Sequence, residues 1–166
     1  MVSAARIPAT TLGALAALLV TSYAAPRKTA DPSACAVAAN GLTLGFTSQF
    51  AGVSQEDHMS NLWSGRVSGS MSGGLVVTLE PLGSLMETAN PIWQVKTRWI
   101  VAPAGQGEDS LVADLYGTVN WKTGRMRLLG VVTEGCFKGY EAAVDARLAD
   151  LDADGTLQIQ PAVALR

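Results

Sequence analysis

The sequence predicts an all-β protein: a single antiparallel, eight-stranded, up-and-down barrel. Between about Gly41 and Pro161, apolar and polar residues alternate in short runs, and Gly, Asn, Asp and Ser separate the runs. A period of two places alternate side chains on opposite faces of a strand, so each strand has one apolar face. That face must be covered by a second sheet or by closure of the sheet on itself. Eight short strands with short links favour closure, and a β-sandwich is the alternative.

The first 40 residues do not follow this pattern. A short segment with one positive charge, Met1 to Arg6, precedes an uncharged apolar run, Thr11 to Ala25. The small residues Ser22 and Ala24 then occupy the two positions that a signal peptidase recognises before its cleavage site. We therefore predict a signal peptide over residues 1–24, a lead-in segment over 25–40 and a barrel domain over 41–162. An uncleaved membrane anchor is the alternative. Cleavage would make the protein secreted or periplasmic, with no membrane contact afterwards.

The strand pattern is clearest in the middle of the chain, at Ile92–Val101. Its apolar face is formed by Trp93, Val95, Thr97, Trp99 and Val101. The opposite face carries Lys96 and Arg98, and because charged side chains are rarely buried, the tryptophan face must point inward. Three earlier strands are predicted at Gly41–Phe50, Trp63–Met71 and Gly74–Glu80. The best candidate for a short helix is Glu80 to Asn90, where leucines recur at helical spacing.

The C-terminal third predicts a meander of successive hairpins. The strands are expected at Leu111–Trp121, Arg125–Thr133, Tyr140–Ala149 and Thr156–Pro161. Turn residues separate them: Lys122 to Gly124, Glu134 to Gly139, and Asp152 to Gly155. Alternation directs Leu115, Leu128 and Val144 inward from three of these strands.

Charge is sparse and balanced. Charged residues make up 16% of the chain, compared with about 25% in an average soluble domain. The formal net charge is −2 and no basic run stands out, which argues against nucleic acid and anionic membranes as partners. We expect a mixed, solvated face on which basic and acidic residues interleave, and an anion site is the alternative. The basic residues are Lys96, Arg98, Lys122, Arg125 and Arg127, and the acidic ones are Asp114, Glu134 and Asp145. The sequence indicates no cofactor and does not determine the oligomeric state.

The two cysteines, Cys35 and Cys136, predict one disulfide. An even pair in an exported chain is more often bonded than free, and the alternative is two separate buried thiols. No further ligands with the spacing of a metal site accompany them, so no metal site is predicted.

The candidate ligand-binding residues are Trp93, Trp99 and Trp121. An eight-stranded barrel is just wide enough to be filled by side chains or to hold one small ligand. Tryptophans lining a cavity would bind an apolar or aromatic molecule. Ordinary core packing is the alternative. No catalytic residue is predicted, because the single histidine, His58, is accompanied by no identifiable nucleophile.

The run from Gly117 to Gly139 has glycines at 117, 124, 130, 135 and 139, spread over successive hairpins. Over residues 111–150 the chain resembles the glycine-spaced hairpins of the allene oxide cyclases and dirigent-like barrels. This resemblance implies a calycin or dirigent-like barrel with an apolar cavity. It also implies either cyclase-type isomerisation or the guidance of a reactive phenolic. None of the functional residues of those families maps onto a position here.

Three classes of function follow. The first is a carrier of a small apolar molecule, the second a cyclase- or isomerase-type enzyme acting on such a molecule, and the third a structural or interaction protein with a filled core. The nearly all-apolar inner face disfavours an enzyme. An open cavity lined by tryptophan would favour the carrier, and a filled interior would favour the interaction protein.

Overall fold

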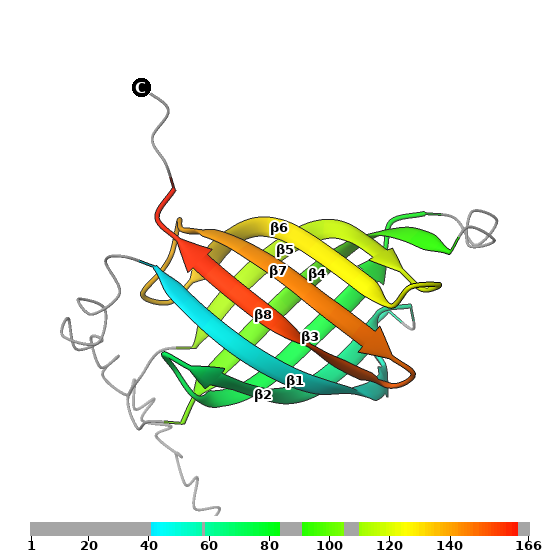
Figure 1. The fold of residues 1–166 in the computed structure, drawn as a ribbon, viewed down its shortest axis with the longest axis horizontal. Coiled ribbons are helices and arrows are strands. Elements are labelled where there is room, and N and C mark those ends of the chain that lie inside the picture. The colour runs from blue at the N-terminus through cyan, green and yellow to red at the C-terminus, as the bar shows by residue number, and fades with distance from the viewer. Residues whose placement is uncertain (1–40, 58, 84–90, 105–109, 163–166) are drawn as a thin grey trace, which may run out of the picture.

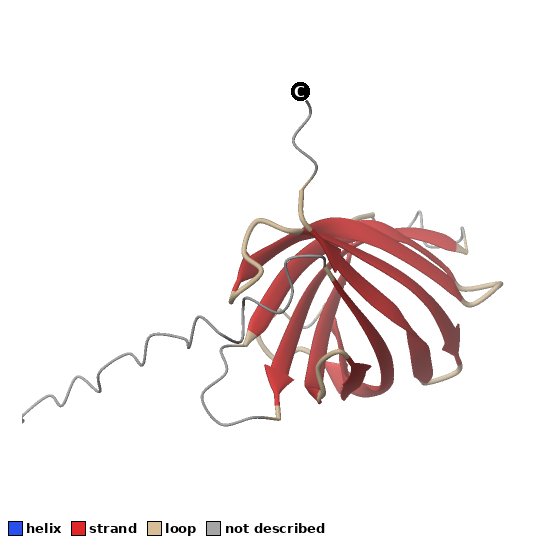
Figure 2. Ribbon diagram, turned by 60° about the vertical axis from the view of Figure 1, so that its left-hand side comes forward, coloured by secondary structure: helices blue, strands red, loops and turns tan. Residues whose placement is uncertain are grey.

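The computed structural model describes residues 41–57, 59–83, 91–104 and 110–162. Eight strands form a closed barrel, as Figures 1 and 2 show. The strands are β1 (Leu42–Val53), β2 (Asn61–Gly69), β3 (Gly73–Pro81), β4 (Ile92–Pro103), β5 (Leu111–Asn120), β6 (Arg125–Glu134), β7 (Glu141–Ala149) and β8 (Asp152–Gln160). Each strand pairs antiparallel with its neighbours in sequence, and β1 pairs with β8 to close the ring. The predicted up-and-down barrel is confirmed, and the sandwich alternative is wrong.

The start of β8 differs from the prediction. The residues Asp152 to Gly155 give a turn signal in the sequence, yet they belong to the strand. The turn is formed instead by Asp150, which takes a left-handed φ of 55°, and Leu151, whose carbonyl accepts a hydrogen bond from the Phe50 N–H at 2.8 Å. Ala153 is buried inside the barrel, so tertiary packing outweighs the local turn composition.

The apolar faces point inward as predicted. In β4, Val95, Trp99 and Val101 are buried, whereas Lys96 is only partly buried and Arg98 is exposed. Leu115, Leu128 and Val144 are buried from β5, β6 and β7. All eight strands contribute to one hydrophobic core. This core provides the main stabilisation, at roughly 25 cal/mol for each Å² of apolar surface removed from water.

Inward-facing glycines let neighbouring strands come close together. A Cβ added at Gly65 would lie 2.0 Å from the Thr47 carbonyl oxygen, and one at Gly117 would lie 2.0 Å from that of Arg127. These distances exclude any side chain. Such glycines mark the tightly bent corners of the barrel, where a strand has no room for a Cβ.

Several sequence predictions fall wholly or partly outside the described residues. The signal peptide and the lead-in lie outside them altogether. Of the predicted helix at Glu80 to Asn90, residues 80 and 81 belong to β3, and residues 84–90 are not among those described. Within the described part of the chain, no helix is long and apolar enough to cross a membrane.

Candidate functional site

Trp99 lies in the centre of the packed interior. Its side chain is 1% exposed, and its ring meets Phe46 in an edge-to-face contact with centroids 4.9 Å apart. The indole Nε1–H donates a hydrogen bond to Thr97 Oγ1 at 3.1 Å, and the Thr97 hydroxyl donates to the Leu115 carbonyl at 3.4 Å. Both polar groups of this pair are therefore satisfied inside the barrel, and neither is left to recognise a ligand.

The space beside Trp99 is very small. A cavity of about 10 Å³ lies between Trp63, Trp99 and Met126. A volume of that size holds one water molecule at most, because a single water needs roughly 10–15 Å³ by this measure. The interior around Trp99 therefore has no room for a small apolar molecule.

Trp93 and Trp121 lie together at one mouth of the barrel. Their rings make an edge-to-face contact with centroids 5.2 Å apart. Trp93 packs partly buried against the core, whereas Trp121 is 36% exposed at the start of the β5–β6 turn. The backbone N–H of Trp121 donates a hydrogen bond to the Pro91 carbonyl at 2.8 Å, which fixes the turn against the beginning of β4.

The structure thus brings two of the three candidate tryptophans together and leaves Trp99 apart, in contact with Phe46 instead. The alternation rule correctly places both Trp93 and Trp99 on the inward face. It cannot tell a residue at a mouth from one at the centre. The ligand-binding role of these three residues stays a prediction.

The described interior contains no buried acidic or basic side chain that could serve in acid–base catalysis. The buried polar side chains of the described residues are Ser48, Ser60 and Thr97, and none of them is acidic or basic. Nor does this part of the chain hold a group of three or more potential metal ligands. His58 lies outside the described residues. The enzyme alternative therefore receives no support from the described interior.

One carboxylate outside the core has a strongly perturbed pKa. Asp57 lies in the β1–β2 loop and accepts hydrogen bonds from the Ser60 hydroxyl and from the backbone N–H groups of Met59 and Ser60, both at 3.0 Å. The Ser60 hydroxyl, followed by these two amides, holds the pKa of Asp57 well below its ordinary value. All of these partners are local, so the arrangement stabilises the loop.

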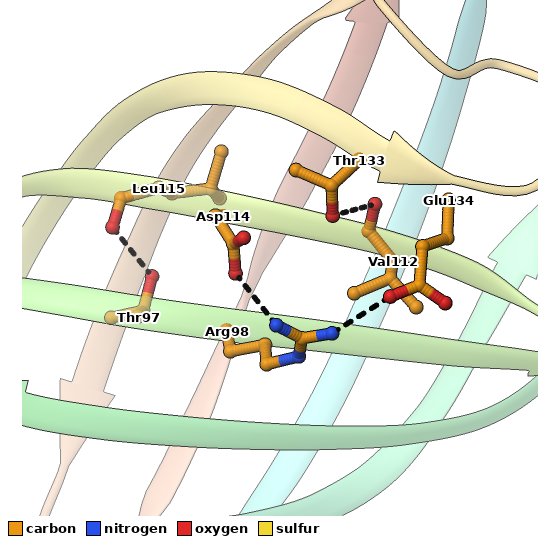
Figure 3. Close-up of polar contacts among 7 residues, drawn as sticks. All are labelled: Thr97, Arg98, Val112, Asp114, Leu115, Thr133 and Glu134. Carbon is orange, nitrogen blue, oxygen red and sulfur yellow. Dashed lines mark hydrogen bonds and ion pairs between the residues drawn. The ribbon is translucent and has the colours of Figure 1, made fainter.

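The outer surface carries the mixed charges that the sequence predicts. Arg98 reaches Glu134 at 2.9 Å and Asp114 at 3.6 Å, so that it connects three adjacent strands (Figure 3). Arg127 similarly lies 3.3 Å from Asp145. These side chains are all at least a quarter exposed, so each ion pair contributes only about 0–1 kcal/mol.

Cys136 is exposed in the β6–β7 turn. Its predicted partner, Cys35, lies outside the described residues, and the pairing stays a prediction. No described cysteine is a free thiol.

A broad concavity lies on the outside of the barrel. This outer hollow measures about 1040 Å³ and runs from β8 across β1 and β2 to the start of β3. Figure 1 shows β8, β1 and β2 side by side on one face of the molecule. The outward-facing residues that line it include Gly45, Thr47, Arg66, Ser68, Gly74, Asp154 and Thr156. Local sequence patterns do not indicate this hollow directly, although outward-pointing glycines within strands are the signal that could have revealed it.

No protein family model, no curated protein and no solved structure matches this chain.

Proposed function

We propose that this protein is an exported binding module that contacts its partner through the outside of a filled barrel. The single observation that carries the proposal is the interior beside Trp99, where the cavity measures only about 10 Å³. A carrier of the usual kind encloses most of its ligand's surface in a pocket of roughly 300–1,000 Å³. The filled core favours the interaction class among the three that the sequence leaves open.

Titration with benzene, followed by calorimetry or NMR, tests this proposal. The wild-type protein should show no saturable binding, because its core offers no space. Leu128→Ala removes a fully buried side chain and should create an apolar cavity of the kind that binds benzene. This variant is the positive control for the method. Saturable binding by the wild type that persists in Trp121→Ala, and therefore lies inside the core, would overturn the proposal and restore the carrier.

Export is supported by the order of regions in the first 25 residues, a charged start followed by an apolar run and then small residues. N-terminal sequencing of the protein from its source cells tests this part. The mature chain should begin near Ala25. A cytoplasmic protein that retains Met1 would contradict it.

A second candidate function is the binding of a small aromatic molecule at the mouth of the barrel. It is favoured by the contact between Trp93 and the partly exposed Trp121. Titration with unlabelled indole should then shift the ¹⁵N NMR signal of the Trp93 indole N–H saturably in the wild type. Trp121→Ala should abolish this response, whereas Trp63→Phe, a change at a buried tryptophan, should leave it in place. An unchanged response in Trp121→Ala would reject this candidate.

A further inference from the structure

Apart from Gly52 and Gly69, whose φ is positive, the glycines within the strands fall into two groups. In the first group, an added Cβ would lie 2.0–2.4 Å from a neighbouring carbonyl oxygen, so the fold itself requires glycine; these are Gly65, Gly73, Gly117, Gly130 and Gly155. In the second group the backbone is ordinary and the space is open. A Cβ at Gly45 would meet nothing closer than 3.6 Å, and one at Gly74 would meet nothing within 4 Å. A glycine within a strand lowers the free energy of unfolding by roughly 0.5–1 kcal/mol relative to alanine. Gly45 and Gly74 therefore reduce stability at positions where the fold does not require glycine.

Gly45 and Gly74 both line the outer hollow, on β1 and β3. Their missing side chains leave the backbone of the hollow open to close approach from outside. Several exposed positions around them carry short hydroxyl side chains, such as those of Thr47 and Ser68, and two carry charges, Arg66 and Asp154. A surface of this kind offers hydrogen-bonding groups and little bulk to something that lies flat upon it.

Two opposite charges stand in the same hollow at a defined spacing. The strand register places Asp154 opposite Thr47, Thr47 opposite Arg66, and Arg66 opposite Gly74. The Cα atoms of Asp154 and Arg66 are therefore two strand spacings apart, about 9–10 Å, and both side chains point outward from the sheet. Both are exposed, and neither forms an ion pair with another described residue. Arg147 lies beside Asp154 on β7, outside the hollow.

From the hollow and this pair of opposite charges, we infer that the site binds an extended polypeptide segment of a partner. This inference rests on the proposed function and names the surface that performs it. The segment carries one basic and one acidic side chain three residues apart. In a polyproline II conformation, residues three apart lie on the same side and about 9.3 Å from each other. That spacing matches the distance from Asp154 to Arg66, so the basic group meets Asp154 and the acidic group meets Arg66.

The proposal is tested by NMR titration of the ¹⁵N-labelled full chain with the capped peptide Gly-Lys-Pro-Pro-Glu-Gly. Saturable shifts should appear at the amides of Gly45, Thr47 and Gly74. The peptide with Gln in place of both Lys and Glu should bind at least about tenfold more weakly. Arg66→Glu should weaken binding to a similar extent. The double exchange Arg66→Asp with Asp154→Arg should restore it, because the peptide can lie in the opposite direction.

Two control variants separate the charge pattern from general effects. Exchanging Glu80 and Lys96, an opposite-charge pair in register on β3 and β4, changes the same kinds of charge outside the hollow and should leave binding unchanged. Gly74→Leu fills open space, so the fold should be retained while the peptide binds at least about tenfold more weakly.

Several outcomes would overturn the proposal. These are no saturable shift at about 10 mM peptide, shifts that do not respond to Arg66→Glu, or hollow shifts produced by a neutral oligosaccharide such as cellohexaose and not by the peptide.

Failure of the peptide to bind can be distinguished from failure of the proposed function. If the peptide does not bind and benzene does not bind the wild type, the hollow is rejected and the filled module remains. If benzene binds inside the core of the wild type, the proposed function itself fails.

Discussion

At the scale of single residues, Trp99 is packed and hydrogen-bonded inside the barrel. Its ring packs against Phe46, its N–H is satisfied by Thr97, and its side chain is 1% exposed. Trp99→Ala should therefore lower the free energy of unfolding by about 3–5 kcal/mol, the range for truncating a packed aromatic residue. Urea denaturation measures the change. Trp121→Ala, at a residue that is 36% exposed, is the matched control and should cost clearly less. Equal costs would show that Trp99 is not the centre of the core.

Two adjacent glycines allow a sharp comparison. A Cβ at Gly73 would lie 2.1 Å from the Ala102 carbonyl oxygen, whereas one at Gly74 would meet nothing within 4 Å. Gly73→Ala should therefore destabilise the protein by more than 1 kcal/mol, of the order of strained substitutions. Gly74→Ala should leave it unchanged or stabilise it by up to about 1 kcal/mol. Thermal unfolding of both variants gives the order. The reverse order would contradict the assignment of Gly74 to a binding surface.

At the scale of elements, the β1–β2 loop is organised by one carboxylate. Asp57 accepts hydrogen bonds from the Ser60 hydroxyl and from the Met59 and Ser60 amides. A backbone hydrogen bond from the Ser54 N–H to the Ser60 carbonyl, at 2.8 Å, closes the loop. The pKa of Asp57 is lower in the folded than in the unfolded protein. Its contribution to stability is therefore present above the ordinary aspartate pKa of about 3.9 and is lost as the pH falls through the folded value.

The Asp57→Asn variant tests this pH dependence. The wild type should be more stable than the variant at pH 7, because the ionised carboxylate accepts stronger hydrogen bonds than an amide oxygen. The difference between the two should shrink as the solution is acidified below the ordinary pKa. Chemical denaturation across a pH series measures it. A difference that stays constant from neutral to acid pH would rule out the carboxylate as the cause.

The predicted disulfide also belongs to this scale, since it would tie the lead-in segment to the β6–β7 turn. A bond between Cys35 and Cys136 closes a loop of about 100 residues, for which the chain-entropy model gives up to ~4–5 kcal/mol. Reduction should lower the unfolding midpoint accordingly. Peptide mapping of non-reduced protein should find the two cysteines linked. Two titratable free thiols in the secreted protein would disprove the pairing.

The strands differ in how far they could be predicted from the sequence. β4 could be placed closely because its alternation is unbroken from Trp93 to Val101 and its charges all lie on one face. The start of β8 could not, since Asp152 to Gly155 has a turn-like composition that packing against β1 and β7 overrides. Local residue preferences decide a strand's limits only where the neighbouring strands do not.

At the scale of the whole molecule, closure of the barrel removes every exposed edge among the described strands, and the inward side chains of all eight strands form one core. The sequence could predict which face of each strand points inward. It could not predict the volume left inside, because that volume depends on how Trp63, Trp99 and Met126 interlock across the barrel. Nor could it predict the outer hollow, whose shape depends on register between strands that are far apart in sequence, such as β8 and β1.

The measurement that tests the filled interior most directly follows the indole N–H of Trp99 by ¹⁵N NMR during titration with an apolar probe such as benzene. This group is buried and bonded to Thr97, so its signal reports directly on the centre of the barrel. The filled interior predicts that the signal keeps its position throughout and exchanges slowly with deuterium. A saturable shift of the Trp99 signal would contradict it, because it would show that the barrel admits a ligand at its centre.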